Sequence, residues 1–212
     1  MKIQYLGHSS FLLASSDGLT IVTDPYSPEV GFRMPEIEAD VVTVSHHHFD
    51  HDYVKAVGGN PRVIDGAGSY DVKGVHIEGV SSFHDEVGGK KRGANTIFKF
   101  SMDGMTVCHF GDIGEPYSKE LIEKIRPADV ILIPVGGNYT INAKTAKDYV
   151  NGVDPKVVIP MHYRVKGGKI DIGNLEQFTD LFDNVVDDGV SQVALSAEGL
   201  NDKTRIIVLR RA

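Results

Sequence analysis

The chain has 212 residues, of which 41% are hydrophobic and 24% are charged, and its formal net charge is −7. This length and composition are typical of one folded domain, so we expect a single domain over residues 1–212 with no membrane span. The acidic balance disfavours a nucleic-acid surface, and the lone cysteine, Cys108, excludes an internal disulfide and so predicts a cytoplasmic location.

The first third of the chain has the pattern of β-strands that lead into a histidine-rich string. Short apolar segments rich in β-branched residues alternate with turn residues. We expect strands at 2–7, 10–15, 18–25 and 39–45, the last running directly into HHHFDHD at 46–52. After the string, DYVKAVGG at 52–59 is expected to form a short helix with Asp52 as its N-cap.

Beyond the string, strand patterns alternate with three predicted helices. Each helix begins at or after a Ser or Asn that can accept hydrogen bonds from its first N–H groups. The expected helices are 118–125 with Ser118 as cap, 143–150 after Asn142, and 175–182 after Asn174. The last segment, SQVALSAEGLNDKTRIIVLRR, is expected to close the fold as a hairpin.

Two stretches of the chain share one plan, which indicates an internal duplication. TIVTDPYSPEVGFRMPEIEADVVTVSH and TVCHFGDIGEPYSKELIEKIRPADVILIPVGG each hold a strand that ends at an aspartate, Asp24 or Asp112. A PYSxE segment and an ADV strand then follow in the same order. Short matches can arise by chance. The alternative to chance is a duplication of a β-rich half. The two copies would then form two sheets packed face to face, with helices outside them.

The string at 46–52 has the spacing of metal ligands. His46 and His48 are two residues apart, so on an extended segment their side chains point the same way and can converge on one ion. Asp50 and His51 follow after the chain has turned, so they can face a second ion. The alternative is a polar loop whose histidines are incidental.

Three further ligand-type residues, His84, Asp112 and His162, stand at the ends of predicted strands. Taken singly, a buried core histidine or a turn-capping aspartate is the simpler interpretation of each. Together with the string they supply five histidines and two aspartates. This set is large enough for a binuclear site that keeps an open coordination position for water.

The chain resembles the metallo-β-lactamase superfamily in these residues and in their order. Asp24 of TDP corresponds to that family's early aspartate, and the match spans the chain. Segments such as GHSSFLL, RGANTIF, HFGDIG and IPMHY are similar to those of its compact hydrolases, the ascorbate-phosphate lactonase-like and phospholipase D-like proteins. The resemblance implies an α+β fold, a four-layer αββα sandwich of two mixed β-sheets, which agrees with the duplication.

The resemblance also implies a metal-dependent hydrolase with a binuclear centre. It assigns the first ion to His46, His48 and His84, the second to Asp50, His51 and His162, and a bridging position to Asp112. Zinc is the expected metal for this His-rich set, with manganese and iron as alternatives. A hydroxide bridging the ions would attack a small ester, lactone or phosphoester, and Asp50 would orient it.

Four further residues are expected around the metal centre. Asp24 and His109 would lie behind the ligands, where Asp24 would hydrogen-bond a ligand histidine and fix its tautomer; a strand-end cap is the alternative role for Asp24. His8 is expected near the cleft, in substrate contact or proton delivery. Tyr139 would donate a hydrogen bond to a developing oxyanion, or else form a plain aromatic rim.

A basic turn is expected to select anionic substrates. GGKKRGAN at 88–95 places Lys91 and Arg92 on a glycine-rich turn just after His84, and Arg164 follows His162 by two residues. These cations could clamp a phosphate or carboxylate of a small-molecule substrate. A solvated hairpin tip is the alternative interpretation of the turn.

Three other functions compete with small-molecule hydrolysis. Relatives that act as phosphodiesterases or nucleases on nucleic acid usually carry an extra domain, for which 212 residues leave no room. Redox chemistry on a di-iron site usually needs a flavin-binding partner domain, and the sequence shows none. A non-catalytic metal-binding module would keep the ligands without turnover, and the presence of Asp50 argues against it.

Overall fold

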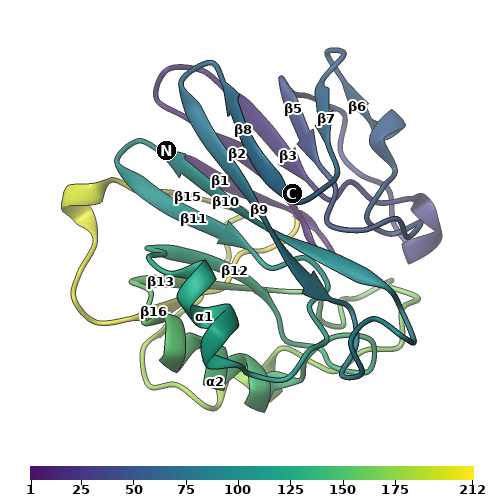
Figure 1. Ribbon diagram of the computed structural model, residues 1–212, viewed down its shortest axis with the longest axis vertical. Coiled ribbons are helices and arrows are strands. Elements are labelled where there is room, and N and C mark those ends of the chain that lie inside the picture. The colour runs from purple at the N-terminus through teal and green to yellow at the C-terminus, as the bar shows by residue number, and fades with distance from the viewer.

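Two large mixed β-sheets lie face to face in the computed structural model, which describes all 212 residues (Figure 1). The first sheet has six strands. In spatial order they are β15 (Gln192–Ala194), β1 (Lys2–Gly7), β2 (Ser10–Ala14), β3 (Thr20–Thr23), β5 (Val41–Thr43) and β7 (Arg62–Ile64). The strands predicted in the first third of the chain are therefore confirmed.

The second sheet has eight strands. In spatial order they are β14 (Val185–Val186), β16 (Arg205–Ile207), β13 (Val157–Met161), β12 (Val130–Pro134), β11 (Met105–His109), β10 (Ala94–Met102), β9 (Val75–Phe83) and β8 (Gly68–Val72). A short parallel pair, β4 (Ile37–Glu38) and β6 (Val57–Gly58), forms a separate sheet.

The two large sheets repeat one strand plan, as the duplicated sequence predicts. β1, β2 and β3 pair antiparallel, and β3, β5 and β7 then pair parallel. In the second sheet β9, β10 and β11 pair antiparallel, and β11, β12 and β13 pair parallel. Each half therefore changes from antiparallel to parallel pairing at its third strand.

Helices α1 (Lys119–Ile125) and α2 (Ala143–Val153) lie against the eight-stranded sheet, on the side away from the six-stranded sheet (Figure 1). The short helix α3 (Glu176–Thr179) packs beside α2. Ser118 and Asn142 cap α1 and α2 as predicted, because their side chains accept hydrogen bonds from first-turn N–H groups. None of the helices has the length and apolar character that crossing a membrane requires.

The main core is a cluster of 47 buried residues between the sheets and under the helices. Every residue of β12 and β13 is buried, because the other sheet covers one face of these parallel strands and helices cover the other. Alternation along β3 sends Ile21 into this core and Val22 into a second cluster of six buried residues. That second cluster lies on the outer face of the six-stranded sheet.

The outer side of the six-stranded sheet carries 3-10 turns instead of α-helices. These turns are η1 (Pro28–Val30) and η2 (Val54–Ala56). The predicted α+β sandwich of two mixed sheets is confirmed, with α-helices covering one outer face and the segment that holds these turns covering the other.

The predicted helix at 52–59 is wrong. Only the turn η2 forms there, with Tyr53 at its N-cap position, and Asp52 does not cap it. The chain then becomes extended at β6, which pairs with β4. A segment this short cannot recover the cost of helix nucleation alone, so the strand pairing prevails.

Two predictions near the C-terminus also need correction. The helix expected at 175–182 is limited to α3, which Leu175 rather than Asn174 precedes. After α3 the chain forms 3-10-type hydrogen bonds, in which the N–H groups of Leu181 and Phe182 donate to carbonyl oxygens three residues earlier. The closing hairpin does not form, because β15 pairs with β1 in one sheet and β16 pairs with β13 in the other. The polar segment between them, with the turn η3 (Ala197–Gly199), crosses between the sheets.

Candidate metal centre

Ligand-type side chains from both sheets meet at one edge of the sandwich. The string at 46–51 follows β5 of the six-stranded sheet. In the eight-stranded sheet, His84 follows β9, Asp112 follows β11 and His162 follows β13. All seven residues predicted as ligands are buried except His48. The fold therefore gathers residues that are more than a hundred positions apart in the sequence.

His46, His48 and His84 form one group of possible ligands. One ring nitrogen of each residue lies within 4.8 Å of the others. The ring centroids of His46 and His48 are 4.5 Å apart, and those of His46 and His84 are 4.6 Å apart. His48 is exposed, so this group reaches the surface. Its three nitrogens are placed to hold one metal ion.

Asp50, His51 and His162 form a second group, which the structure enlarges with His8. The Nε2 atom of His8 lies 3.0 Å from Oδ2 of Asp50. His8 has a positive φ of 55°, and its carbonyl oxygen accepts hydrogen bonds from the Tyr5 hydroxyl and the His162 N–H, each at 2.9 Å. The turn after β1 is therefore anchored to the strand end that carries His162.

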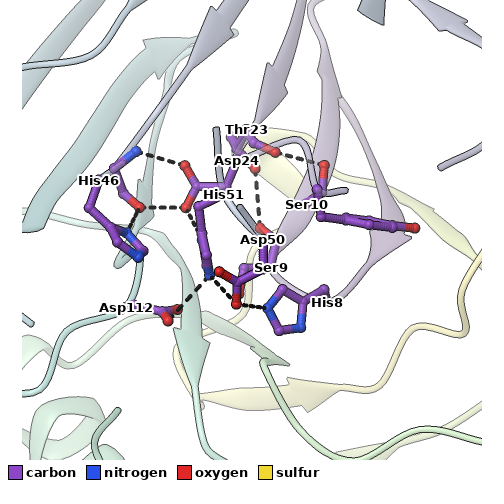
Figure 2. Close-up of polar contacts among 12 residues, drawn as sticks. His8, Ser9, Ser10, Thr23, Asp24, His46, Asp50, His51 and Asp112 are labelled. Atoms are coloured by element: carbon purple, nitrogen blue, oxygen red, sulfur yellow. Dashed lines mark hydrogen bonds and ion pairs between the residues drawn. The ribbon is translucent and has the colours of Figure 1, made fainter. Parts of the chain in front are cut away.

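Asp112 lies between the two groups, and Figure 2 shows its contact with His51. Its Oδ2 atom is 3.2 Å from Nε2 of both His51 and His162, and 3.6 Å from Nε2 of His84. Its Oδ1 atom has no hydrogen-bond partner. The backbone N–H of Asp112 donates to Oδ1 of Asn95 at 2.9 Å. One carboxylate thus reaches histidines of both groups from a fixed backbone position.

The chemistry of these side chains fits a metal ion. Buried Nε2 of His46 and Nδ1 of His84 lack hydrogen-bond partners, and Nε2 of His51 and His162 meet Asp112 at 3.2 Å without forming a hydrogen bond of good geometry. A buried polar atom without a partner costs free energy, so such a concentration calls for a ligand that satisfies them. Imidazole nitrogens and carboxylate oxygens are the donors that zinc, manganese and iron accept. The cluster is therefore a candidate metal centre.

The charges in the cluster act strongly on one another. Burial raises the pKa of Asp112, but His162 and His51 hold it well below its usual range. Burial lowers the pKa of His51, but Asp112 and Asp50 raise it well above its ordinary value. Burial, with the field of His162 adding to it, lowers the pKa of His8 to about 4. The carboxylates are therefore anionic at neutral pH, the form in which they bind metals.

Asp24 lies fully buried behind the ligands, and both of its oxygens are engaged (Figure 2). One oxygen accepts from the Ser45 N–H at 2.8 Å, and the other accepts from the Ser45 hydroxyl at 2.6 Å and lies 2.9 Å from Nδ1 of His51. Because the Ser45 hydroxyl donates to Asp24, its oxygen can accept from Nδ1–H of His46, 2.9 Å away. With a metal ion bound, this arrangement would leave Nε2 of both histidines free to ligate it.

His109 is also buried behind the cluster, beside Asp24. Its Nε2 lies 2.7 Å from the carbonyl oxygen of Ser9, and its Nδ1 accepts from the Gly111 N–H at 3.3 Å. The same Nδ1 is 4.0 Å from Oδ2 of Asp24. His109 therefore contacts backbone and Asp24 rather than the two ligand groups.

A cleft of about 640 Å³ opens over the cluster. Its rim includes Phe49, Arg92, Tyr139 and Lys169. Arg92 and Tyr139 lie where the sequence predicts substrate contacts, whereas Lys169 has no counterpart among the predicted site residues. The cleft has the size of a small-molecule site.

Two residues of the predicted basic clamp lie outside this cleft. Lys91 forms an ion pair with Glu86 on the exposed turn. Arg164 pairs with Asp171 at 2.9 Å and lines a separate cavity. Of the three cations that the sequence proposes for substrate binding, the structure brings only Arg92 to the cleft.

Three residues important to the geometry were not predicted as site residues. Ser45 links Asp24 to His46, and its position directly before the histidine string is a usable signal. Asn95 holds the backbone of Asp112, and it lies in the RGAN motif that the resemblance includes. Lys169 stands in a loop with no recognisable pattern, so nothing in the sequence marks it.

The fold and the cluster together define an α+β sandwich of two mixed sheets with a candidate metal centre at one edge. Comparison with known families then identifies the family: the profile of the β-lactamase superfamily domain matches residues 2–162. The chain belongs to this superfamily. A relative from Carboxydothermus hydrogenoformans, named a metal-dependent hydrolase, is 32% identical over 192 residues, covering 77% of this chain and 84% of the relative.

Solved structures agree with this family. A protein of Thermotoga maritima, provisionally described as a Zn-dependent hydrolase of the metallo-β-lactamase superfamily, is 40% identical, with a TM-score of 0.81 over 99% of both chains. A metallo hydrolase of Ignicoccus hospitalis, at 23% identity, has a TM-score of 0.60 and covers 80% of this chain and 86% of its own. The second comparison shows a shared fold.

Proposed function

We propose that this protein is a hydrolase that holds two divalent metal ions, with zinc as the resident metal, and cleaves a small ester, lactone or phosphoester. The observation that carries the proposal is the pair of ligand groups with Asp112 between them. The names of the relatives, metal-dependent and Zn-dependent hydrolase, support it. The cleft of about 640 Å³ supports a small-molecule substrate.

The two groups divide into two ion sites in this proposal. The first ion would be held by His46, His48 and His84, and the second by Asp50, His51 and His162. Asp112 would serve both sites, since its Oδ2 is 3.2 Å from His51 and 3.6 Å from His84, one histidine of each group.

Divalent ions at such sites polarise the electrophile and lower the pKa of a water molecule. Asp50 would orient the attacking water, because its carboxylate faces both His51 and His8, at 3.6 Å and 3.0 Å. His8 would take up or deliver a proton at Nε2, next to Asp50. The hydroxyl of Tyr139, at the rim of the cleft, would donate to the oxyanion that develops on the substrate.

Asp24 and His109 would position the ligands rather than touch the substrate. The hydrogen bond from Nδ1 of His51 to Asp24 would fix the tautomer of that ring, and Ser45 would extend the same control to His46. His109, whose Nδ1 lies 4.0 Å from Asp24 and whose Nε2 bonds the Ser9 carbonyl, would help to enclose this carboxylate.

Metal analysis and a substrate panel test the proposal. We expect purified protein to contain two equivalents of zinc and to hydrolyse at least one member of a panel of aryl esters, lactones and phosphodiesters. Asp50→Ala should abolish turnover and weaken the second site. His76→Ala, at an exposed histidine paired with Asp71 away from the cleft, is the control for surface binding. Unchanged turnover in metal-replete Asp50→Ala protein would refute the mechanism.

A further inference from the structure

The rim of the cleft carries two cations that lack an ion-pair partner. Arg92 and Lys169 both line the cleft, and neither takes part in any of the ion pairs of the chain. The chain as a whole has a net charge of −7, so carboxylates are abundant elsewhere on it. Two unpaired cations at the mouth of this one cleft therefore produce a local field that attracts anions.

The carboxylates that share the cleft do not neutralise this pair. Asp50 and Asp112 face the histidines of the metal centre. Asp171 pairs with Arg164 at 2.9 Å rather than with Arg92 or Lys169. The positive charges of Arg92 and Lys169 consequently remain available to a ligand.

Arg92 is held at the rim before any ligand binds. The carboxylate of Asp85 accepts hydrogen bonds from the N–H groups of Val87, Gly89, Lys91 and Arg92, at 2.7–2.9 Å, and so ties the whole turn together. The guanidinium donates to the carbonyl oxygen of Asn138 at 3.3 Å and lies 5.7 Å from the ring centroid of Tyr139. Its other N–H groups are free to bind an anion in a bidentate manner.

Lys169 is presented by a closely packed loop. Its backbone N–H donates to the carbonyl oxygen of Val30 at 2.8 Å. A Cβ atom added to Gly31 would lie 2.2 Å from the carbonyl oxygen of Gly167, so the two loops approach as closely as glycine allows. The start of the Lys169 side chain is therefore fixed, while its exposed ammonium can reach into the cleft.

Apolar groups complete the rim. The side chains of Phe49 and Tyr139 are 46% and 40% exposed, and Ile170 lines the cleft next to Lys169. Exposed aromatic rings are costly in water and stabilising against an apolar ligand surface. The rim therefore offers two cations and two aromatic rings outside the metal centre.

We propose that the substrate carries a non-reacting anionic group, a carboxylate or a phosphate, which Arg92 and Lys169 bind, and an apolar or aromatic segment that packs on Phe49 and Tyr139. This inference rests on the proposed hydrolase function. The bond that is cleaved lies at the metal centre, and the anion at the rim orients it. The cleft thus selects small anionic esters or lactones over their neutral counterparts.

A matched pair of esters tests this selectivity. 4-Carboxyphenyl acetate and 4-carbamoylphenyl acetate differ in charge but have nearly the same shape. Zinc-loaded wild-type protein should show a kcat/KM for the anionic ester about 10- to 100-fold above that for the neutral one, the effect of charge-assisted hydrogen bonds. In the Arg92→Gln, Lys169→Gln double variant the two values should become equal. Lys166→Gln, which removes an exposed charge from the same loop outside the cleft, is the matched control.

A binding experiment separates this inference from the proposed function. Zinc-loaded protein is titrated calorimetrically with 4-hydroxybenzoate, 4-hydroxyphenylphosphonate and the neutral 4-hydroxybenzamide. Tighter binding of either anion, lost in the double variant but kept in Lys166→Gln, supports the anion site even if no ester is hydrolysed. Whichever of the two anions binds more tightly indicates whether the rim prefers a carboxylate or a phosphate group. An anion preference that survives in the double variant, or equal binding of all three compounds to wild type, overturns the inference.

Discussion

Asp24 and Asp112 follow corresponding strands in the two halves of the molecule, β3 and β11, yet their carboxylates have different surroundings. Both oxygens of Asp24 accept hydrogen bonds from Ser45, and one also faces Nδ1 of His51. Asp112 keeps one oxygen without a partner and directs the other at histidine Nε2 atoms of both ligand groups. In the proposed metal centre, the aspartate of the first half would hold ligands in place, and the aspartate of the second half would itself be a ligand.

The difference shows how a duplicated fold can build an asymmetric site. In the first half, the N–H and hydroxyl of Ser45 donate hydrogen bonds to the carboxylate of Asp24, and the histidine string follows Ser45 directly. In the second half, Asn95 binds only the backbone of Asp112 and leaves its carboxylate free. Neighbouring residues, rather than the aspartates themselves, decide which carboxylate remains open.

Replacement of Asp112 should have the largest effect. In Asp112→Ala the histidines of both groups lose their shared carboxylate, so we expect loss of bound zinc and a fall in kcat/KM larger than the roughly 100-fold typical of losing an outer partner. Elemental analysis and turnover measure the two effects. Circular dichroism checks that the variant is folded. A fully metallated, active Asp112→Ala protein would contradict the ligand role of Asp112.

Replacement of Asp24 should have an intermediate effect with a different signature. In Asp24→Asn an amide NH₂ or a weaker acceptor meets the donors of Ser45 and His51, so we expect zinc affinity to fall about 10- to 100-fold. Chelator-treated protein should also lose about 1–3 kcal/mol of unfolding free energy, because buried donors lose a charged acceptor. Denaturant melts without metal measure this loss. Equal stability of the two metal-free proteins would contradict the holding role.

Asp40, a hydrogen-bonded carboxylate far from the site, should show the smallest effect. It accepts from the N–H and hydroxyl of Thr20 at 2.9 and 3.1 Å and from Lys73 at 2.6 Å, and the Lys73 contact lowers its pKa below the ordinary 3.8. The pKa of Asp40 is lower in the folded than in the unfolded state. Its contribution to the free energy of unfolding is therefore complete above the unfolded-state pKa, and it is lost as the pH falls from there through the folded-state pKa.

Thermal melts of Asp40→Asn across pH test this expectation. The variant should be destabilised by less than about 1 kcal/mol at pH 7, since the pair is partly exposed. The difference from wild type should shrink as the pH is lowered through about 4 toward 3. Lys73→Gln should reproduce the loss at pH 7. A difference that grows on acidification would reverse the sign of the linkage and refute the assignment.

Local patterns in the sequence predicted much of the fold. The alternation in the first strands, the caps at Ser118 and Asn142, and the repeated TDP and FGD segments all depend on neighbours within a few residues. Predictions failed where the outcome depended on distant partners. The segment at 52–59 became extended because β4 was available to pair with it, and the C-terminal segment divided between two sheets.

The candidate site divides in the same way. The sequence by itself determined the ligand-type residues and their order, because the spacing within the string and the positions at strand ends are properties of a local segment. Only the tertiary structure decided that Arg92 and Lys169 face the cleft while Lys91 and Arg164 are paired elsewhere. It also decided that Asp24 is enclosed by Ser45 and Asp112 is open. A charge on a flexible side chain takes whichever partner the folded loops bring near, and no local pattern encodes that choice.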